Sequence, residues 1–288
     1  MIWFSCHSEN FGFFGREDTF AFISRLGFRY IDVAARSFMP QSEIVAAPEP
    51  GARIIRDLGE TYALKPDELF LGPLEIDGAN IDPSAGDAAH DPEAYRRFEV
   101  ICRYARMAGF SSVMGAAGTE NAALGYEHSF ENASAVLTKL VMIAADNGVA
   151  YHVEPSRNSL LNTPEKALRM IGAAPGLKYT LDFLHYQINA VPLRDSMRLI
   201  PHAGHMHARQ AAAGIGKCDY ERGEIDYDPI VQRLCAMEWS GGIAMEFWNG
   251  PEQDAQGICP VEQNIRMKYE LKCLIRKYGA KTLPLIET

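Results

Sequence analysis

The feature that most constrains the fold is a repeated alternation of short apolar runs with stretches of helical spacing. Eight runs have the length and apolar character of β-strands, at residues 2–6, 29–35, 69–76, 111–117, 149–154, 177–183, 200–208 and 242–248. Between them, apolar residues recur at helical intervals in 17–26, 93–107 and 132–146. Several runs are almost continuously apolar, which is typical of parallel strands covered on both faces. The pattern therefore predicts an α/β fold built on a parallel sheet.

Helix start and stop signals agree with this alternation. Three dipeptides place an N-cap residue before a first-turn proline, namely Asp91-Pro92, Thr163-Pro164 and Asp228-Pro229. Four glycines follow helical runs, where a left-handed residue is favoured, namely Gly27, Gly109, Gly148 and Gly279.

The length favours a closed barrel. The chain has 288 residues, or about 36 for each of eight units, which is ample for a strand, a helix and two loops. No G-x-G-x-x-G follows a strand, and the GIGK segment at 214–217 is too short for a phosphate-binding loop. We therefore expect residues 1–288 to form one domain, a (β/α)8 TIM barrel.

Composition excludes several other classes. The net charge is −9 with no basic block, which argues against nucleic-acid binding. No apolar run approaches the length of a membrane span, and the N-terminus MIWFSCHSEN lacks the features of a signal peptide. The six cysteines are scattered without a C-x-x-C pair, as expected of reduced thiols. We expect a cytoplasmic protein that does not bind membranes.

Carboxylates and imidazoles gather at the ends of the later strands. Glu154, Asp182, His207 and Glu246 lie at or near the ends of four successive runs, and His185 follows Asp182 by three residues. In a βα barrel the C-terminal strand ends meet at one face, where chemistry takes place. Three carboxylates and one imidazole form a mostly oxygen site, which suits Mn²⁺ first, with Mg²⁺, Co²⁺ or Zn²⁺ as alternatives. We therefore predict that these four residues bind one divalent metal.

Strand alternation places other polar side chains near the same site. His152 shares a side of its strand with Glu154, and His205 shares one with His207. The earlier strands end at His7 and Glu9, at Arg36 and at Glu75, and we expect these residues to line the pocket.

Such a metal site favours a particular chemistry. It leaves open positions for two vicinal substrate oxygens, and a chelated hydroxy-ketone has an acidified α-C–H bond. The metal stabilises the enediolate that forms when the proton leaves, and a neighbouring carboxylate acts as the base.

These residues resemble the xylose isomerase-like sugar isomerase/epimerase superfamily of TIM barrels, which includes ketose 3-epimerases, hydroxypyruvate isomerases and inosose dehydratases. The resemblance covers most of the chain and is strongest over 100–248. It rests on the strand end His152-Val153-Glu154, LNT at 161–163, D-x-x-H at Asp182–His185, H-x-H at His205–His207, G-x-I-D at Gly223–Asp226, and Glu246.

The resemblance implies a role for each matched residue. Glu154, Asp182, His207 and Glu246 would be the metal ligands, and His185 would contact substrate oxygens. Glu154 and Glu246 would also be the acid/base pair, acting from opposite faces of the substrate. We count His7 among the substrate-binding residues as well. We expect a homo-oligomer, either a dimer or a tetramer.

The chain departs from the ketose 3-epimerase pattern at three positions. Leu160 replaces a substrate-binding Glu, Ala213 replaces an Arg, and Gln210 stands where many members have an Asp. Arg157 and Arg209 lie just past two ligand-bearing strands. They would either clamp a substrate carboxylate or form salt bridges at the rim.

Our leading hypothesis is a divalent-metal-dependent isomerase or epimerase of a keto-sugar or sugar acid, with proton transfer through a metal-bound enediolate. Two alternatives stay open. One is a lyase of the same fold, a decarboxylase or dehydratase acting on a 3-keto sugar acid or related polyol derivative. The other is a non-catalytic sugar-binding barrel.

Overall fold

The computed structural model describes residues 1–86, 90–248 and 250–279. Eight parallel strands close into a barrel in the order β1-β10-β9-β8-β7-β6-β3-β2, which confirms the predicted (β/α)8 architecture. Each of the eight predicted runs overlaps one of these strands, although β1, β3 and β10 extend beyond their predicted bounds. Their bounds are β1 Ile2–His7, β2 Tyr30–Ala34, β3 Lys65–Gly72, β6 Ser112–Gly115, β7 Ala150–Val153, β8 Lys178–Asp182, β9 Ala203–Ala208 and β10 Gly241–Met245.

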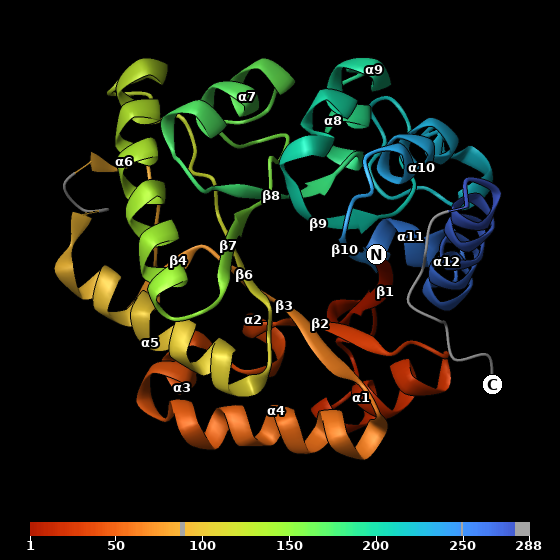
Figure 1. Ribbon diagram of the computed structural model, residues 1–288, viewed down its shortest axis with the longest axis horizontal. Helices are drawn as coiled ribbons and strands as arrows, with labels where there is room; N and C mark the ends of the chain where they lie inside the picture. Colours follow the sequence, from red (N-terminus) through yellow and green to blue (C-terminus); the bar gives the residue numbers. More distant parts are fainter. Residues whose placement is uncertain (87–89, 249, 280–288) are drawn as a thin grey trace.

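Helices surround the strands on all sides (Figure 1). The longer ones are α1 Arg16–Arg25, α4 Pro48–Tyr62, α5 Pro92–Ala108, α6 Gly125–Asp146, α7 Pro164–Ala173, α10 Tyr227–Ala236 and α12 Pro260–Lys277. The shorter ones are η1 Ser8–Phe11, α2 Ala35–Phe38, α3 Gln41–Ala46, α8 Leu184–Ile188, α9 Leu193–Ser196, η3 Met197–His202, η4 Tyr220–Arg222 and α11 Pro251–Ala255. No helix in the described part of the chain is long and apolar enough to cross a membrane.

Two of the three predicted N-caps are confirmed. The side chains of Asp91 and Thr163 accept hydrogen bonds from the first turns of α5 and α7. The third prediction was wrong, because α10 begins one residue earlier than Asp228 and the side chain of Asp226 accepts from the Asp228 amide. The cap is still an Asp, but it is Asp226, so Pro229 occupies the third position of the helix and not the first.

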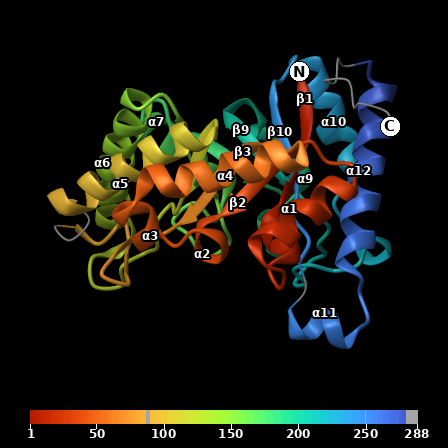
Figure 2. The same cartoon turned by 90° about the horizontal axis from the view of Figure 1, so that it is seen from below.

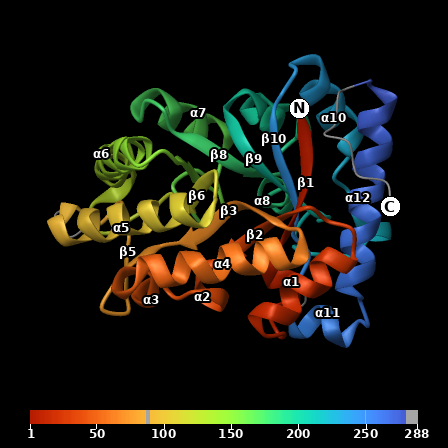
Figure 3. The same ribbon diagram turned by 60° about the horizontal axis from the view of Figure 1, so that its bottom comes forward.

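The run predicted as one strand at 69–76 is divided. Strand β3 ends at Gly72, and Leu74–Ile76 forms β4, which pairs antiparallel with β5 at Ala79–Ile81. Asp77 and Gly78 connect the two with φ values of 51° and 81°. Positive φ at both central residues is the conformation that a tight hairpin requires, and Asp-Gly favours it. This β4–β5 hairpin lies beside α5 and α3 in Figure 3.

One end of the barrel carries the loops that follow the strands. In Figure 2, β1 runs from the N-terminus at the top toward the lower edge, where α11 follows β10. The lower edge is therefore the C-terminal face of the barrel. Side chains that point inward from the last residues of the strands meet at this face.

Candidate metal centre

Four side chains from four consecutive strands converge at the C-terminal face. Glu154 directly follows β7, Asp182 ends β8, His207 lies in β9, and Glu246 directly follows β10. One ligand atom from each lies within 4.8 Å of the others. Asp182, His207 and Glu246 are buried and Glu154 is partly buried. The structure thus brings together the four residues that the sequence predicted as metal ligands.

The imidazole of His207 shows which way the group faces. Its Nδ1 lies 2.9 Å from Oε2 of Glu246 and 3.1 Å from Oε1 of Glu154. Its Nε2 points into the barrel, is buried with no hydrogen-bond partner in the described part of the chain, and lies 3.9 Å from Oδ2 of Asp32. A histidine that presents one nitrogen to a metal commonly directs the other toward a carboxylate. Three carboxylates, together with an Nδ1 that faces Glu154 and Glu246, therefore fit a divalent cation of the Mn²⁺ or Mg²⁺ type.

The group keeps the carboxylates of Glu154 and Glu246 ionised. Burial raises the pKa of Glu154, but the nearby His185 and His207 imidazoles hold it well below its usual value. Burial also raises the pKa of Glu246, and Arg209 and His207 outweigh that effect and lower it. The pKa of His207 is correspondingly raised, because Glu246 and Glu154 overcome the opposing effect of burial. A site that stabilises charged carboxylates in a buried position is prepared for a cation.

Arg209 contacts the predicted ligands themselves. Its Nε and Nη2 donate to Oδ2 of Asp182 at 2.8 and 2.6 Å, and Nη2 lies 3.1 Å from Oε2 of Glu246. The residue is only 6% exposed. Arg157 differs, because its side chain is exposed. Its neighbours Ser156 and Asn158 line a cavity beside the metal group, but Arg157 is not among the described residues that line it. The two arginines therefore occupy different environments.

His185 and His7 each lie beside one member of the group. Nε2 of His185 lies 3.2 Å from Oε2 of Glu154, and Glu154 raises the pKa of this imidazole against the effect of burial. The ring of His7 lies 5.6 Å from that of His207. Nδ1 of His7 accepts a hydrogen bond from the Glu9 amide, so in the neutral tautomer Nε2 carries the proton. Burial lowers the pKa of His7, and its buried Nε2 has no partner among the described residues.

Glu9 and Arg36 lie above this site, and Glu75 does not. Arg36 makes a two-pronged ion pair with Glu9, which also accepts from Ser37. Glu75 instead lies in β4, where its amide donates to Gln41. The sequence could not separate these cases, because it placed Glu75 at the end of a single strand.

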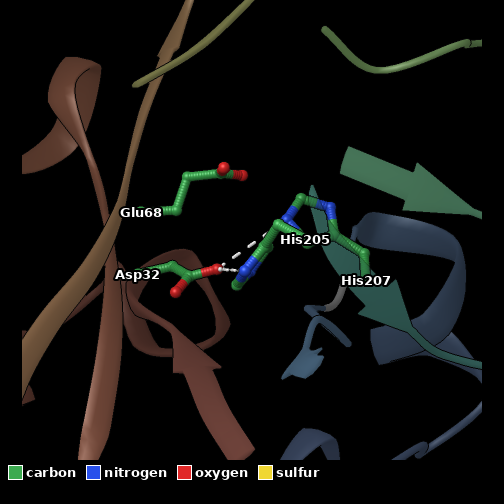
Figure 4. A group of neighbouring side chains, drawn as sticks. All are labelled: Asp32, Glu68, His205 and His207. Atoms are coloured by element: carbon green, nitrogen blue, oxygen red, sulfur yellow. Dashed lines mark hydrogen bonds and ion pairs between the residues drawn. The ribbon is translucent and has the colours of Figure 1, made fainter. Parts of the chain in front are cut away.

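A second acid–imidazole group lies inside the barrel, beneath the first. It consists of Asp32, Glu68, His205 and His207 (Figure 4). Asp32 accepts from Ser5 at 2.6 Å and contacts Nε2 of His205 at 2.7 Å. Burial lowers the pKa of His205, but Asp32 and Glu68 raise it to about 9, so the imidazole is protonated at neutral pH. A cation is therefore already present in this layer, in the form of His205.

Glu68 is satisfied in the same layer. Its carboxylate accepts from Ser112 at 2.7 Å and Thr180 at 2.6 Å, and it contacts Nδ1 of His152 at 2.7 Å. With every oxygen occupied, these residues form a structural network that supports His207 from below. Our sequence reasoning missed Asp32 and Glu68. The available signal was a carboxylate within a strand-like apolar run for Asp32, and directly before one for Glu68.

Lys217 is another residue that sequence reasoning missed. Its Nζ lies 3.1 Å from the centroid of the Trp248 ring. Burial and the nearby Arg209 lower its pKa to about 8, against the opposing influence of Glu246 and Glu9. It belongs to the GIGK segment, which has no phosphate-loop geometry but places a cation near the site.

A cavity of about 420 Å³ extends from the metal group. Glu154 and Arg36 lie at one side, and the β4–β5 hairpin and the loops after β6 and β7 form the rest. Its apolar wall includes Phe70, Pro73, Ile81, Pro83, Met114 and Ala117. Phe70 joins the two regions, since its ring stacks on His207 with centroids 6.2 Å apart.

The three departures from the epimerase pattern have clear positions. Gln210 is buried and fixes Ile225, donating to its carbonyl at 3.1 Å and accepting from its amide at 3.2 Å. Leu160 is buried in the core, and Ala213 is exposed. Gln210 therefore holds a loop, and the two apolar residues provide no polar contact to a sugar.

Comparisons with known proteins agree with the fold. A family model described as "Xylose isomerase-like TIM barrel" matches residues 20–269. No curated protein matches the chain.

Among solved structures, an L-ribulose 3-epimerase is similar, with a TM-score of 0.74, 16% identity, and coverage of 96% of both chains. A probable 3-DHS dehydratase from Bacillus anthracis has a TM-score of 0.69 at 16% identity, covering 93% of this chain and 98% of its own. The 3-keto-D-glucoside 4-epimerase of E. coli has a TM-score of 0.67 at 16% identity, covering 94% and 98%.

Proposed function

Because this chain belongs to the xylose isomerase-like TIM barrel family, we propose that it is a divalent-metal-dependent isomerase or epimerase of a keto-sugar or sugar acid. The observation that carries the proposal is the convergence of Glu154, Asp182, His207 and Glu246 within 4.8 Å, each from a different strand. Fold similarity alone would not distinguish the chemistries that this architecture supports.

The four converging residues would hold the cation, with Mn²⁺ as the leading candidate. When bound, the cation would polarise the substrate carbonyl and stabilise the negative charge that develops as the neighbouring C–H bond breaks.

Glu154 and Glu246 are the candidate acid/base pair. They extend from β7 and β10, with β8 and β9 between those strands. A substrate bound at the centre would therefore meet one carboxylate on each side. Since the pKa of each is held low, both are ionised at neutral pH and either can accept the proton. Epimerisation follows when the opposite glutamate, after taking up a proton from solvent, delivers it to the other face of the same carbon. Isomerisation follows when the first glutamate returns its proton to the neighbouring carbon.

His185 and His7 would orient the substrate. His185 contacts Glu154 at 3.2 Å, so it fixes that carboxylate and lies within reach of a substrate oxygen. The unpartnered Nε2–H of His7 is a buried donor beside His207. A substrate hydroxyl or carbonyl oxygen would satisfy it, which is a strong reason for binding because unpaired buried donors are costly.

Charge balance leaves both substrate types compatible with the site. Three carboxylates exceed the charge of a divalent cation by one, and Arg209 already pairs with two of those carboxylates. A neutral keto-sugar would therefore meet a balanced site. A sugar acid would need a further cation, and Lys217 is better placed for that role than the exposed Arg157.

The test is isotope exchange in D₂O with the Mn²⁺-loaded protein and a panel of keto-sugars and sugar acids. We expect deuterium at the carbon next to the carbonyl, with exchange abolished in Glu154→Gln and Glu246→Gln. Release of CO₂ or water without this exchange would instead establish the lyase. Binding of a sugar without turnover, unchanged after chelation of the metal, would establish a non-catalytic sugar-binding barrel.

A further inference from the structure

The cavity beside the metal centre is larger than a sugar ring needs. It encloses about 420 Å³. A hexose occupies about 180 Å³, roughly the volume of six waters at ~30 Å³ each in the liquid. The chelating end of the substrate must also lie at the metal group, of which only Glu154 lines this cavity. Most of the space is therefore available to something attached to the sugar.

The wall of the cavity indicates the chemistry of that attachment. Phe70, Met114 and Ile81 present apolar surface, together with Pro73, Pro83 and Ala117. Sugars bind in pockets that offer many hydrogen-bonding groups, whereas an apolar wall gains free energy only by covering apolar surface. Uncharged polar residues such as Asn80 and Asn158 also line it, and so do three charged residues. Of these, Glu154 belongs to the metal group, Arg36 is paired with Glu9, and Asp82 is occupied by the Ser84 and Thr119 amides.

The hairpin over the cavity is fixed at its entry. Gln41 is buried, and its Nε2 donates to the Pro73 carbonyl at 2.7 Å and to the Leu71 carbonyl at 3.3 Å. Its Oε1 accepts from the Glu75 amide at 3.0 Å. Three contacts from one side chain thus hold the start of the hairpin against α3.

The exit of the hairpin is fixed as well. Asp82 follows β5 and accepts from the Ser84 amide at 2.8 Å and the Thr119 amide at 3.1 Å. These bonds tie the hairpin to the loop after β6. Gly118 makes this close approach possible, because a Cβ there would lie 3.1 Å from Oδ1 of Asp82 and its φ is +86°. The cavity is therefore preformed, which reduces the entropic cost of binding.

We infer that the substrate is a keto-sugar carrying a bulky apolar substituent, such as an aryl glycoside, whose substituent occupies the cavity beneath the β4–β5 hairpin. The inference rests on the proposed function for the placement of the sugar at the metal. Phe70 marks the junction, with His207 on one side and the cavity on the other.

The experiment compares two probes by isothermal titration calorimetry on the Mn²⁺-loaded protein. The probes are methyl and phenyl 3-keto-β-D-glucopyranoside, which share the sugar and differ only in the substituent. We expect the phenyl compound to bind about tenfold to a hundredfold more tightly, because its ring is transferred from water to the apolar wall.

Variants on the hairpin locate the effect. Ile81→Asp should bring the ratio of the two dissociation constants close to one, and Ile81→Ala should lower it in the same direction. Ile76→Asp is the matched control, because Ile76 lies on the same hairpin but does not line the cavity. It should keep the wild-type ratio.

Equal affinity for the two probes would overturn the inference, and so would a ratio that both Ile81 variants leave unchanged. Failure of both probes to bind would also overturn it. In each of these cases, D₂O exchange with free keto-sugars tests the proposed function independently, because that exchange does not depend on the substituent.

Discussion

At the scale of single residues, the strongest expectation concerns metal affinity. Glu154→Gln, Asp182→Asn, His207→Ala and Glu246→Gln each remove one of the four converging donors. We expect each variant to lose metal affinity by at least about tenfold to a hundredfold, because even outer partners of a metal site have effects of that size. Elemental analysis after dialysis measures the metal content.

The matched control is Glu165→Gln, which alters a carboxylate that pairs with Arg198 on the surface. It should keep full metal content. If all four variants retained the wild-type metal content while folded, as judged by circular dichroism, the assignment would be refuted.

Arg209 and Arg157 provide the second expectation. Since Arg209 contacts Asp182 and Glu246, its loss should disturb those carboxylates whatever substrate is present. Arg209→Met should therefore lower kcat/KM for a sugar acid and for its neutral analogue by similar factors. Arg157→Met should change neither. A loss confined to the acid in Arg209→Met would instead show that this guanidinium clamps the substrate.

The two arginines also show how far the sequence reaches at this scale. Strand periodicity and the barrel rule were enough to bring Glu154, Asp182, His207 and Glu246 together, because backbone geometry alone fixes those positions. The direction of Arg209 depends on its side-chain rotamers and on which partner is nearest. Those are three-dimensional facts, and the sequence left a substrate clamp and a salt bridge as equal alternatives.

At the scale of elements, the β4–β5 hairpin is the main feature that the sequence did not predict. The run at 69–76 is mostly apolar on either side of Gly72-Pro73, and the turn residues Asp77 and Gly78 lie just beyond it. The hairpin is inserted in a loop and pairs with none of the eight barrel strands. The alternation of eight strands and helices therefore gave no signal for it. The Asp-Gly pair was the local sign of this turn.

Gln41 gives a test of that element. Gln41→Ala removes the side chain that holds residues 71, 73 and 75. Each buried group left without a partner costs about 1–3 kcal/mol. We expect faster amide hydrogen exchange across 73–81, with exchange in β1 and β10 unchanged. Gln187→Ala, which removes a contact with Glu224, is the control. If amide exchange across 73–81 in Gln41→Ala were as slow as in the wild type, the hairpin would be held by other contacts.

At the scale of the whole molecule, the barrel interior departs from an apolar core. Glu68 joins β3 to β6, β7 and β8 through Ser112, His152 and Thr180. Removing one member of a buried ionic network typically costs about 3–5 kcal/mol. Glu68→Ala should therefore lower the free energy of unfolding by about that amount in urea titrations, whereas Glu99→Ala, at an exposed position of α5, should have little effect. A change below about 1 kcal/mol would contradict the structural role.

Metal removal tests the centre and the fold together. A ligand that binds only the folded state stabilises it by about 2.7 kcal/mol when its concentration is one hundred times Kd. At roughly 2–4 °C per kcal/mol for a chain of this size, that stabilisation corresponds to a rise in Tm of roughly 5–10 °C. Mn²⁺ should therefore raise Tm of the chelator-treated protein by about this amount, with a stoichiometry of one ion per chain.

The second group, of Asp32, Glu68, His205 and His207, should take no ion, because its carboxylates already contact His205, His152 and three hydroxyls. Glu246→Gln should show little or no rise in Tm. A stoichiometry of two would contradict the structural role of the interior layer, and an equal rise in Glu246→Gln would place the ion elsewhere.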